Sequence, residues 1–376
     1  SWKSLNEDVI TSDGKVTLQP TSQKVTLILK LTLGDETMEK EFTLTTASYV
    51  DNHIKVDYAK DFLSSNLVDL EYVDGKIVLK DGKLEGYYES EIYKTRNFTS
   101  LVGSWAAISN TQATAELQVR VRVNGTWSKY FSYGTFGLGL QNKMIDQSDI
   151  NAKLDDDIIV INSGKYADAF QYKIILRRTS ETVESAKLSL VAITLQIPNY
   201  TYPVDISNLP KKVEYDLPNL YQVDVPEIGN IICSPTSATM ILMYYGHKFT
   251  DEYPHREVAK LFYDHGNKIY GNWVFNTVGM SAYGEDTYVK RIYSLEELIY
   301  HLATVGPVAL SIKGNTGRYN TNGHLLVVSG YEITDTTRYI LVHDPYLKEV
   351  EYKYSEDIFN QVSRNVIYVI EPKVKK

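Results

Sequence analysis

Apolar and polar residues alternate over short stretches in much of the first half of the chain, which is the pattern of half-buried strands. Residues 115–123, Ala-Glu-Leu-Gln-Val-Arg-Val-Arg-Val, show it most clearly. Asp74-Gly75, Asp81-Gly82 and Asn124-Gly125 fall between such stretches, and these dipeptides favour two-residue hairpin turns. Many short strands with regular turns are typical of a β-sandwich or jelly roll. The pattern therefore predicts an all-β accessory domain over residues 47–200.

Residues 1–46 carry the same kind of signal in a smaller unit. We expect strands over residues 15–19, 23–33 and 38–46, with Gly34-Asp35 as the hairpin turn between the last two. This arrangement resembles the C-terminal half of the bacterial immunoglobulin-like modules found on surface proteins. The resemblance implies a half-module whose partner strands are not in this sequence.

A different pattern follows the proline-containing linker at residues 197–203. Ser294-Leu-Glu-Glu297 forms a capping box at the start of one helix. Helices come first and strands follow: we expect helices over residues 233–245, 256–263 and 295–303, and strands over 308–313, 325–332, 339–343 and 366–370. Helices before an antiparallel sheet indicate an α+β domain, here residues 201–376. The predicted fold is thus multidomain, an all-β N-terminal part followed by an α+β domain.

The chain has one cysteine, Cys233, and it lies where an apolar segment turns into a helix. A thiol at a helix N-terminus is biased toward the thiolate, which is the reactive form. Pro235 suits the first turn of that helix, and Gly246 is a suitable residue to end it. We therefore take Cys233 as a candidate nucleophile.

A nucleophilic cysteine needs a base, and His324 is the best placed of seven histidines because it opens an apolar strand after Gly323. In an antiparallel hairpin, opposite residues have a constant index sum. Placing Glu332 opposite Arg338 makes a favourable charge pair and sets Asp344 diagonal to His324 on the same face. Asp344 is then the residue that orients the imidazole.

Each of these residues also has an ordinary structural interpretation. A lone cysteine is commonly an inert small hydrophobe, a histidine at the start of a strand is commonly a core or edge residue, and Asp-Pro is commonly a turn. The joint arrangement of Cys233, His324 and Asp344 is what favours catalysis.

At these residues the chain resembles the C39-like (bacteriocin-processing-peptidase-like) group of papain-fold cysteine peptidases, over about residues 205–376. The segments that carry the likeness are residues 220–226, 233–246, 323–331 and 342–346. The resemblance implies a papain-like fold, with Cys233 as nucleophile, His324 as general base and acid, and Asp344 as orienting residue. It also implies that Gln222, eleven residues before the cysteine, donates to the oxyanion; a surface-loop glutamine is the alternative.

The chain departs from the family pattern in two ways. Cys-Gly-Pro is replaced by Cys-Ser-Pro, a variant associated with exported members, and no ATP-binding or membrane-spanning part accompanies the domain. We therefore do not expect leader removal during transport. The segment from Gly103 to Ser128 resembles accessory segments that precede exported C39-like domains. Such sandwiches bind carbohydrate, act as spacers or close one wall of a cleft, and the sequence leaves these alternatives open.

The composition of the chain limits the classes of binding partner that we expect. The net charge of −8 argues against nucleic acid or an anionic membrane as the main partner. There is no apolar stretch of about 18 residues, so no membrane span is expected. A single cysteine excludes internal disulfides and a Cys-rich zinc site, and with no Walker or GxGxxG motif we expect neither metal nor cofactor. The opening Ser-Trp-Lys-Ser-Leu-Asn suggests a mature or trimmed form. The near absence of cysteine is typical of exported proteins of Gram-positive bacteria, so we expect a location at the cell surface or outside the cell.

Three functions remain open. The first is an exported cysteine peptidase or amide hydrolase that acts through an acyl-enzyme on a peptide or protein, cell-wall-associated substrates included. The second is a surface adhesin in which Cys233 and Gln222 form an internal thioester. The third is a pseudoenzyme that binds peptide or cell-wall material. His324 and Asp344 favour the first, because a thioester needs neither.

Overall fold

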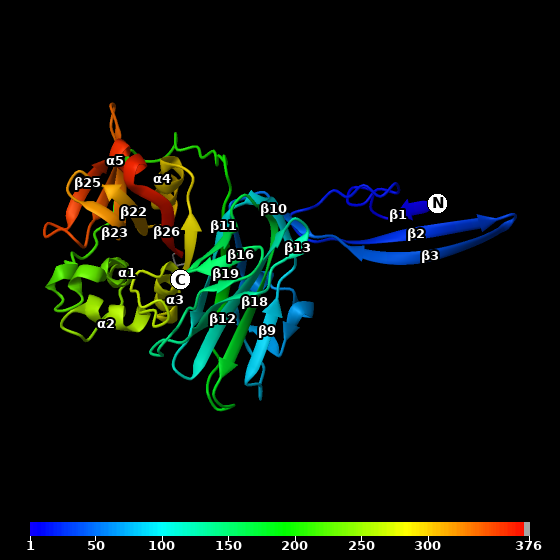
Figure 1. The fold of residues 1–376 in the computed structure, drawn as a ribbon, viewed down its shortest axis with the longest axis horizontal. Helices are drawn as coiled ribbons and strands as arrows, with labels where there is room; N and C mark the ends of the chain where they lie inside the picture. Colours follow the sequence, from blue (N-terminus) through cyan, green and yellow to red (C-terminus); the bar gives the residue numbers. More distant parts are fainter. Residues whose placement is uncertain (372–376) are drawn as a thin grey trace.

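The computed structural model describes residues 1–371, which form three bodies in a row (Figure 1). A small N-terminal sheet lies at one end, a β-sandwich in the middle and an α+β domain at the other end. The predicted fold class, all-β regions followed by an α+β domain, is confirmed. Residues 372–376, the end of the predicted third domain, lie outside the described residues.

The N-terminal sheet contains β1 (Trp2–Ser4), β2 (Lys24–Leu33) and β3 (Glu36–Thr45), in that order. The hairpin turn at Gly34-Asp35 is confirmed, because Leu33 pairs with Glu36. The strand predicted over residues 15–19 is wrong. Val16 makes a single bridge to Ile10, and β1 occupies the edge of β2 instead.

The predicted sandwich has two sheets, which we call the outer sheet and the inner sheet. The outer sheet contains β4 (Ser48–Val50), β6 (Leu67–Val68), β9 (Glu85–Glu89), β10 (Tyr93–Phe98), β12 (Ala113–Val123), β13 (Thr126–Trp127), β14 (Phe131–Phe136) and β18 (Ala167–Arg178). The inner sheet contains β5 (Ile54–Tyr58), β7 (Leu70–Val73), β8 (Lys76–Leu79), β11 (Ser100–Ile108), β15 (Gln147–Ser148), β16 (Ala152–Asp155), β17 (Ile158–Ile161) and β19 (Lys187–Gln196).

Two of the three predicted turns in the sandwich are hairpins. Asp74-Gly75 joins β7 to β8, and Asn124-Gly125 joins β12 to β13. The third prediction, a hairpin at Asp81-Gly82, is wrong. That turn carries the chain from β8 in the inner sheet to β9 in the outer sheet, where β9 pairs with β18. A local turn signal does not reveal which strand the chain will pair with next.

The α+β domain places three helices before most of its sheet. These are α1 (Cys233–Tyr244), α2 (Pro254–Phe262) and α3 (Trp273–Ala282), and α4 (Leu295–Thr304) and α5 (Glu356–Val362) follow. The antiparallel sheet runs β21 (Asp286–Arg291), β26 (Ser363–Glu371), β22 (Val308–Asn315), β23 (Asn320–Ile333), β24 (Arg338–His343) and β25 (Glu351–Ser355), with β20 (Lys212–Glu214) beside β23. Within residues 1–371, no helix is long and apolar enough to span a membrane.

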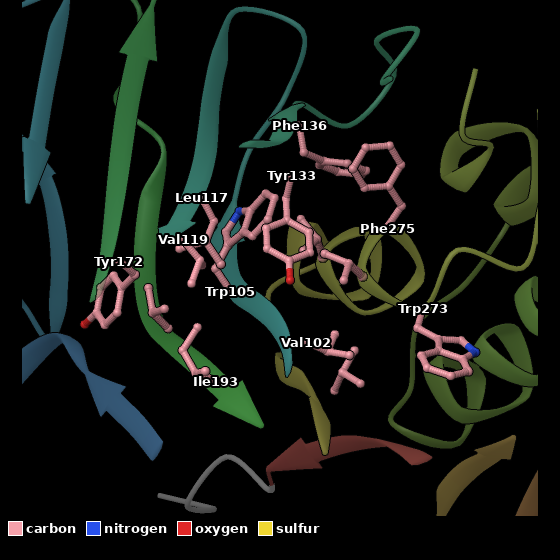
Figure 2. Close-up of a cluster of buried hydrophobic side chains, with 14 of the residues drawn as sticks. Val102, Trp105, Leu117, Val119, Tyr133, Phe136, Tyr172, Ile193, Trp273 and Phe275 are labelled. Atoms are coloured by element: carbon pink, nitrogen blue, oxygen red, sulfur yellow. The ribbon is translucent and has the colours of Figure 1, made fainter. Parts of the chain in front are cut away.

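The sandwich and the α+β domain share a hydrophobic core. In Figure 2, Trp105 lies beside Leu117 and Val119 between the two sheets, while Phe136 of the sandwich faces Phe275 of α3. The rings of that pair meet edge to face at 5.4 Å. Residues 100–107 of β11 are buried on both faces, because α3 and β21 cover the side that the outer sheet does not. The inner sheet is therefore the middle layer of a larger body.

Hydrogen bonds also join these two domains. The main-chain N–H of Val289 donates to Ser104 Oγ at 3.0 Å, and that of Arg291 donates to Thr194 Oγ1 at 2.9 Å. Buried polar groups of both domains are thus satisfied across the junction. The sandwich is built into the α+β domain and does not hang from it as a spacer.

Candidate active site

Cys233 is the first residue of α1 and lines a cleft of about 600 Å³ together with Gln222 and His324. The first turn of α1, which carries Cys233, is joined to the sheet by two hydrogen bonds. Ser234 Oγ lies 2.8 Å from the hydroxyl of Tyr368, and Ser237 Oγ donates to the carbonyl of Leu325 at 3.2 Å. The start of the helix is therefore fixed against the strands that carry the other site residues.

His324 lies on β23, opposite Ile312 of β22. The strand begins at Asn320, four residues before the histidine, and not at the histidine as the apolar run suggested, because residues 320 and 321 still pair with β22. The ring of His324 is buried, and its Nε2 lies 2.8 Å from Asp344 Oδ1. The other ring nitrogen is left for the thiol.

The hairpin that carries His324 and Asp344 has the predicted register near the site but not at its far end. Val327 faces His343, as the predicted index sum requires. Beyond a bulge at Ser329 the register shifts by one, so Glu332 faces Tyr339. The predicted pair of Glu332 with Arg338 is therefore wrong. Arg338 instead binds Glu296 at 2.5 Å and also Glu356, and Glu332 binds Lys353 at 2.5 Å.

Asp344 is fully buried and accepts hydrogen bonds from four groups. Besides His324, these are the hydroxyl of Tyr319 at 2.5 Å, the main-chain N–H of Tyr346 at 3.0 Å and the hydroxyl of Tyr354 at 3.2 Å. Burial alone would raise the pKa of this carboxyl, but the hydrogen bond and charge of His324, with help from Tyr319, hold that pKa below its ordinary value. Asp344 is thus kept ionised.

The thiol and the imidazole shift each other's pKa. Burial would raise the pKa of Cys233, but the charge of His324 and a hydrogen bond to its ring outweigh burial, so the pKa is lowered. Burial would likewise lower the pKa of His324, but the charge of Cys233 and the hydrogen bond to Asp344 raise it. These directions favour a thiolate beside an imidazolium, which is the reactive state of a cysteine nucleophile.

Gln222 lines the same cleft and lies on a 3₁₀ turn over Gln222–Asp224. Its side chain is buried, which excludes the surface-loop alternative. Nε2 donates to the carbonyl of Gly229 at 2.6 Å, and the main-chain N–H donates to the carbonyl of Pro345 at 2.8 Å. An amide nitrogen has two N–H groups, so one remains for a ligand in the cleft.

Three tyrosines around Asp344 were missed by the sequence reasoning. Tyr319, Tyr346 and Tyr354 come from a loop, a turn and β25, and the hydrogen bonds described above hold the carboxylate from three sides. Tyr319 also meets the His324 ring edge-on at 5.7 Å. Tyr346 lies two residues after Asp344, in the segment 342–346 that carries the family likeness. Its place there is the one sequence signal that could have indicated a tyrosine beside Asp344.

The sandwich holds the loop that forms another part of the cleft wall. Lys268, Ile269, Tyr270 and Gly271 line the cleft. Just before them, Asp264 Oδ1 accepts from the N–H of Met144 at 3.0 Å and from that of Gly266 at 2.9 Å. Gly266 passes so close that a Cβ there would lie 1.8 Å from the carbonyl oxygen of Met144. The shape of the cleft therefore depends on a loop of the sandwich.

Nothing in residues 1–371 is arranged as a metal site, since no three His, Cys, Asp or Glu side chains come together in a way that could hold an ion. The chemistry available in the cleft is that of a thiolate, an imidazole, a buried carboxylate and amide donors.

Helices first, an antiparallel sheet after, and a cysteine at the start of the first helix place the α+β domain in the papain-like fold class. Residues 214–368 match the Peptidase_C39 like family, and residues 83–195 match the Peptidase C39 N-terminal domain. The α+β domain, which we call the peptidase domain after this match, is thus similar to the C39-like peptidases, and the sandwich is similar to a domain that precedes C39 peptidases. No curated protein matches the chain at a significant level.

Several solved structures are similar to part of the chain. A double glycine motif protease from an AMS/PCAT transporter, in complex with the leader peptide, is 17% identical over 46% of this chain and 100% of its own, with a TM-score of 0.32. A protein from Bacillus anthracis named as a putative C39-like peptidase is 16% identical over 44% of this chain and 100% of its own, with a TM-score of 0.34. The peptidase domain of Streptococcus ComA, a bi-functional ABC transporter, is 14% identical over 42% and 99%, with a TM-score of 0.31.

Proposed function

We propose that the protein is an exported cysteine peptidase that hydrolyses amide bonds of a peptide or protein substrate through Cys233, His324, Asp344 and Gln222. One observation carries the proposal. A thiol, an imidazole and a buried carboxylate from α1, β23 and the end of β24 meet at one cleft, with 2.8 Å between His324 Nε2 and Asp344 Oδ1. The C39-like family match of residues 214–368 supports it.

In the first half of the reaction, the Cys233 thiolate attacks the carbonyl carbon of the substrate amide. The carbonyl oxygen becomes an oxyanion, which the free N–H of the Gln222 side chain and the main-chain N–H of Cys233 stabilise at the positive end of α1. The His324 imidazolium then gives its proton to the departing amine. The C–N bond breaks, and the acyl group stays on sulfur as a thioester.

In the second half, neutral His324 takes a proton from water, and the resulting hydroxide attacks the thioester carbonyl. The C–S bond breaks, the acid product leaves, and the thiolate and imidazolium are restored. Asp344 does not move a proton in this scheme. It fixes the ring so that Nδ1 faces the sulfur, and it stabilises the imidazolium.

Export and surface location are part of the proposal. The Cys-Ser-Pro variant and the near absence of cysteine are the features that support them. Carbohydrate contact by the sandwich also stays a prediction. Trp127 and Tyr130, which such contact would use, already have the guanidinium of Arg120 over their rings at 4.6 and 4.9 Å, so a sugar would first have to displace it.

Cys233→Ala tests the proposal. We expect the variant to keep the melting temperature of the wild type and to lose both hydrolysis of a peptide mixture and labelling by electrophilic peptide probes. Wild-type protein should gain one probe mass, on Cys233. Hydrolysis at the wild-type rate in Cys233→Ala would refute the assignment. An intact wild-type mass lower by one ammonia, with no free thiol, would point instead to a Cys233–Gln222 thioester.

A further inference from the structure

A second pocket, which the proposed chemistry does not use, lies between the sandwich and the peptidase domain. Its volume is about 580 Å³. Ser100 and Lys165 come to it from the sandwich, and Trp273, Arg291 and Arg364 come from the peptidase domain. We call it the cationic pocket, because three of these five side chains are positively charged.

Arg291 is the most unusual of the three cations. It is only 9% exposed, and its side chain has one hydrogen bond, from Nη2 to Ser100 Oγ at 3.4 Å. Its Nε has no partner within residues 1–371, and no carboxylate of those residues forms an ion pair with it. Asp157 is close enough to act on its charge, but burial raises the pKa of that carboxyl to about 7. A buried guanidinium without a full counter-charge is costly, and a bound anion would remove the cost.

The other two cations are also unpaired with acids. Arg364 is exposed at the pocket and stacks on the ring of Trp273 at 4.7 Å, with no ion pair to any carboxylate of residues 1–371. The amino group of Lys165 donates to the carbonyl of Ile150 at 3.3 Å. The chain has a net charge of −8, but the three cations make the charge around this cavity positive. The pocket therefore attracts an anion.

The cationic pocket adjoins the active-site cleft. Gly271 lines the cleft, and Trp273, two residues later, lines the pocket. Gly323 lines the cleft just before His324, and Arg364 Nη1 lies 4.0 Å from the place where a Cβ on Gly323 would be. A peptide advances about 3.3 Å per residue when extended. A substrate bound in the cleft would thus reach the cationic pocket within a few residues.

We propose that the cationic pocket binds an acidic side chain of the peptide substrate, so that the enzyme prefers peptides with Asp or Glu a few residues from the cleaved bond. This rests on the proposed peptidase function. A carboxylate suits the site because guanidinium groups bind it through paired N–H donors, and Ser100 adds a hydroxyl. The short distance between Arg364 and Gly323 of the cleft favours a carboxylate of the bound substrate over an anionic glycan.

The first arm of the test measures cleavage. Matched fluorogenic peptides would differ only in Glu or Gln at single positions on either side of the cleaved bond. We expect the wild type to show at least a tenfold higher kcat/KM for Glu at one such position. Arg364→Gln, whose exposed site tolerates the change, and Arg291→Gln should reduce that ratio toward one. Arg122→Gln, which removes an equal charge from the outer sheet, should keep it. No Glu preference, or a preference that survives both pocket variants, would overturn the proposal.

The second arm measures binding and needs no hydrolysis. Cys233→Ala protein would be titrated with hexaglutamate, with hexaglutamine and with a heparin hexasaccharide. We expect hexaglutamate alone to bind, and its affinity to fall at least tenfold when Arg364→Gln is added. If no peptide is ever cleaved but this result holds, the peptidase assignment fails while the anion site stands. Binding of heparin alone, or of nothing, overturns the site.

Discussion

The sandwich meets its two neighbours in opposite ways. At the junction with the peptidase domain, β11 of the sandwich is buried on both faces. Ser104 and Thr194 of the sandwich also accept hydrogen bonds from the main chain of β21. The N-terminal sheet extends away from the sandwich (Figure 1), and its contacts with it include the hydrogen bond from Tyr49 N–H to the carbonyl of Gln19 at 2.9 Å. The N-terminal region has a small core of its own, formed by Val9, Ile10 and Val25. The sandwich is thus part of the peptidase body, and the N-terminal sheet is an attachment to it.

The largest expected effect comes from removing the tightly joined neighbour. A chain of residues 201–376 would expose the apolar face of α3 and β21 that now lies on β11 and β19. We expect it to aggregate or to lack cooperative unfolding, because an apolar patch of this kind is not stable in water. A soluble fragment with wild-type activity would show that the junction is dispensable and would break the comparison.

A smaller loss of stability is expected when one buried side chain is removed from the junction and leaves a cavity. Phe275→Ala removes a fully buried ring that packs edge-on against Phe136. Phenylalanine-to-alanine changes in cores cost about 3–5 kcal/mol, and we expect a loss in that range by urea unfolding. Phe42→Ala removes a half-buried ring that meets Trp2 in the N-terminal sheet, and it should leave the main transition in place. Equal losses for the two variants would contradict the difference between the junctions.

The contact between the sandwich and the cleft wall can be tested with two glycines of one loop. A Cβ at Gly266 meets the backbone of Met144, whereas a Cβ at Gly271 meets no atom within 4 Å. We expect Gly266→Ala to lower stability by about 1–3 kcal/mol, the usual cost of overpacking, and to lower kcat/KM as the wall shifts. Gly271→Ala should leave the melting temperature unchanged. If both melt like the wild type, the sandwich does not brace this loop.

The smallest effect is expected at the loose junction. Deleting residues 1–46 removes the N-terminal sheet and leaves every strand of the two sandwich sheets in the chain. It breaks the hydrogen bond from the main-chain N–H of Tyr49 to the carbonyl of Gln19. We expect kcat/KM and the main melting temperature to stay at the wild-type values. A loss of activity on deletion would mean that this sheet contributes to the enzyme after all.

Much of the site could be predicted because its signals are local. The helix start at Cys233 and the strand at His324 are read from neighbouring residues, and hairpin arithmetic brought Asp344 to His324. The same arithmetic failed at Glu332, because the bulge at Ser329 that shifts the register leaves no clear mark in the sequence.

What could not be predicted depends on long-range packing. All ten residues of α3 are buried, so the helix has no polar face and no amphipathic period to detect. The sequence of β11 does not reveal that α3 and β21 cover one of its faces, because those elements lie more than 160 residues later in the chain. Tyr319 lies 25 residues before the carboxylate that it binds, and the cations of the second pocket come from segments still farther apart, so only the fold brings these groups together.

The most direct test of the proposed thiolate–imidazolium pair is the pH dependence of Cys233 alkylation by iodoacetamide, measured by mass spectrometry in the wild type and in His324→Ala. The pKa of the thiol is lowered and that of the imidazole is raised, so the thiolate should form before the imidazolium loses its proton. We predict that wild-type alkylation stays fast at pH values below the ordinary pKa of a thiol and slows only as the pH falls through the lowered pKa of Cys233. In His324→Ala the curve should move to higher pH, because burial then acts without the opposing charge. Identical curves for the two proteins, each with an ordinary or raised thiol pKa, would contradict the account.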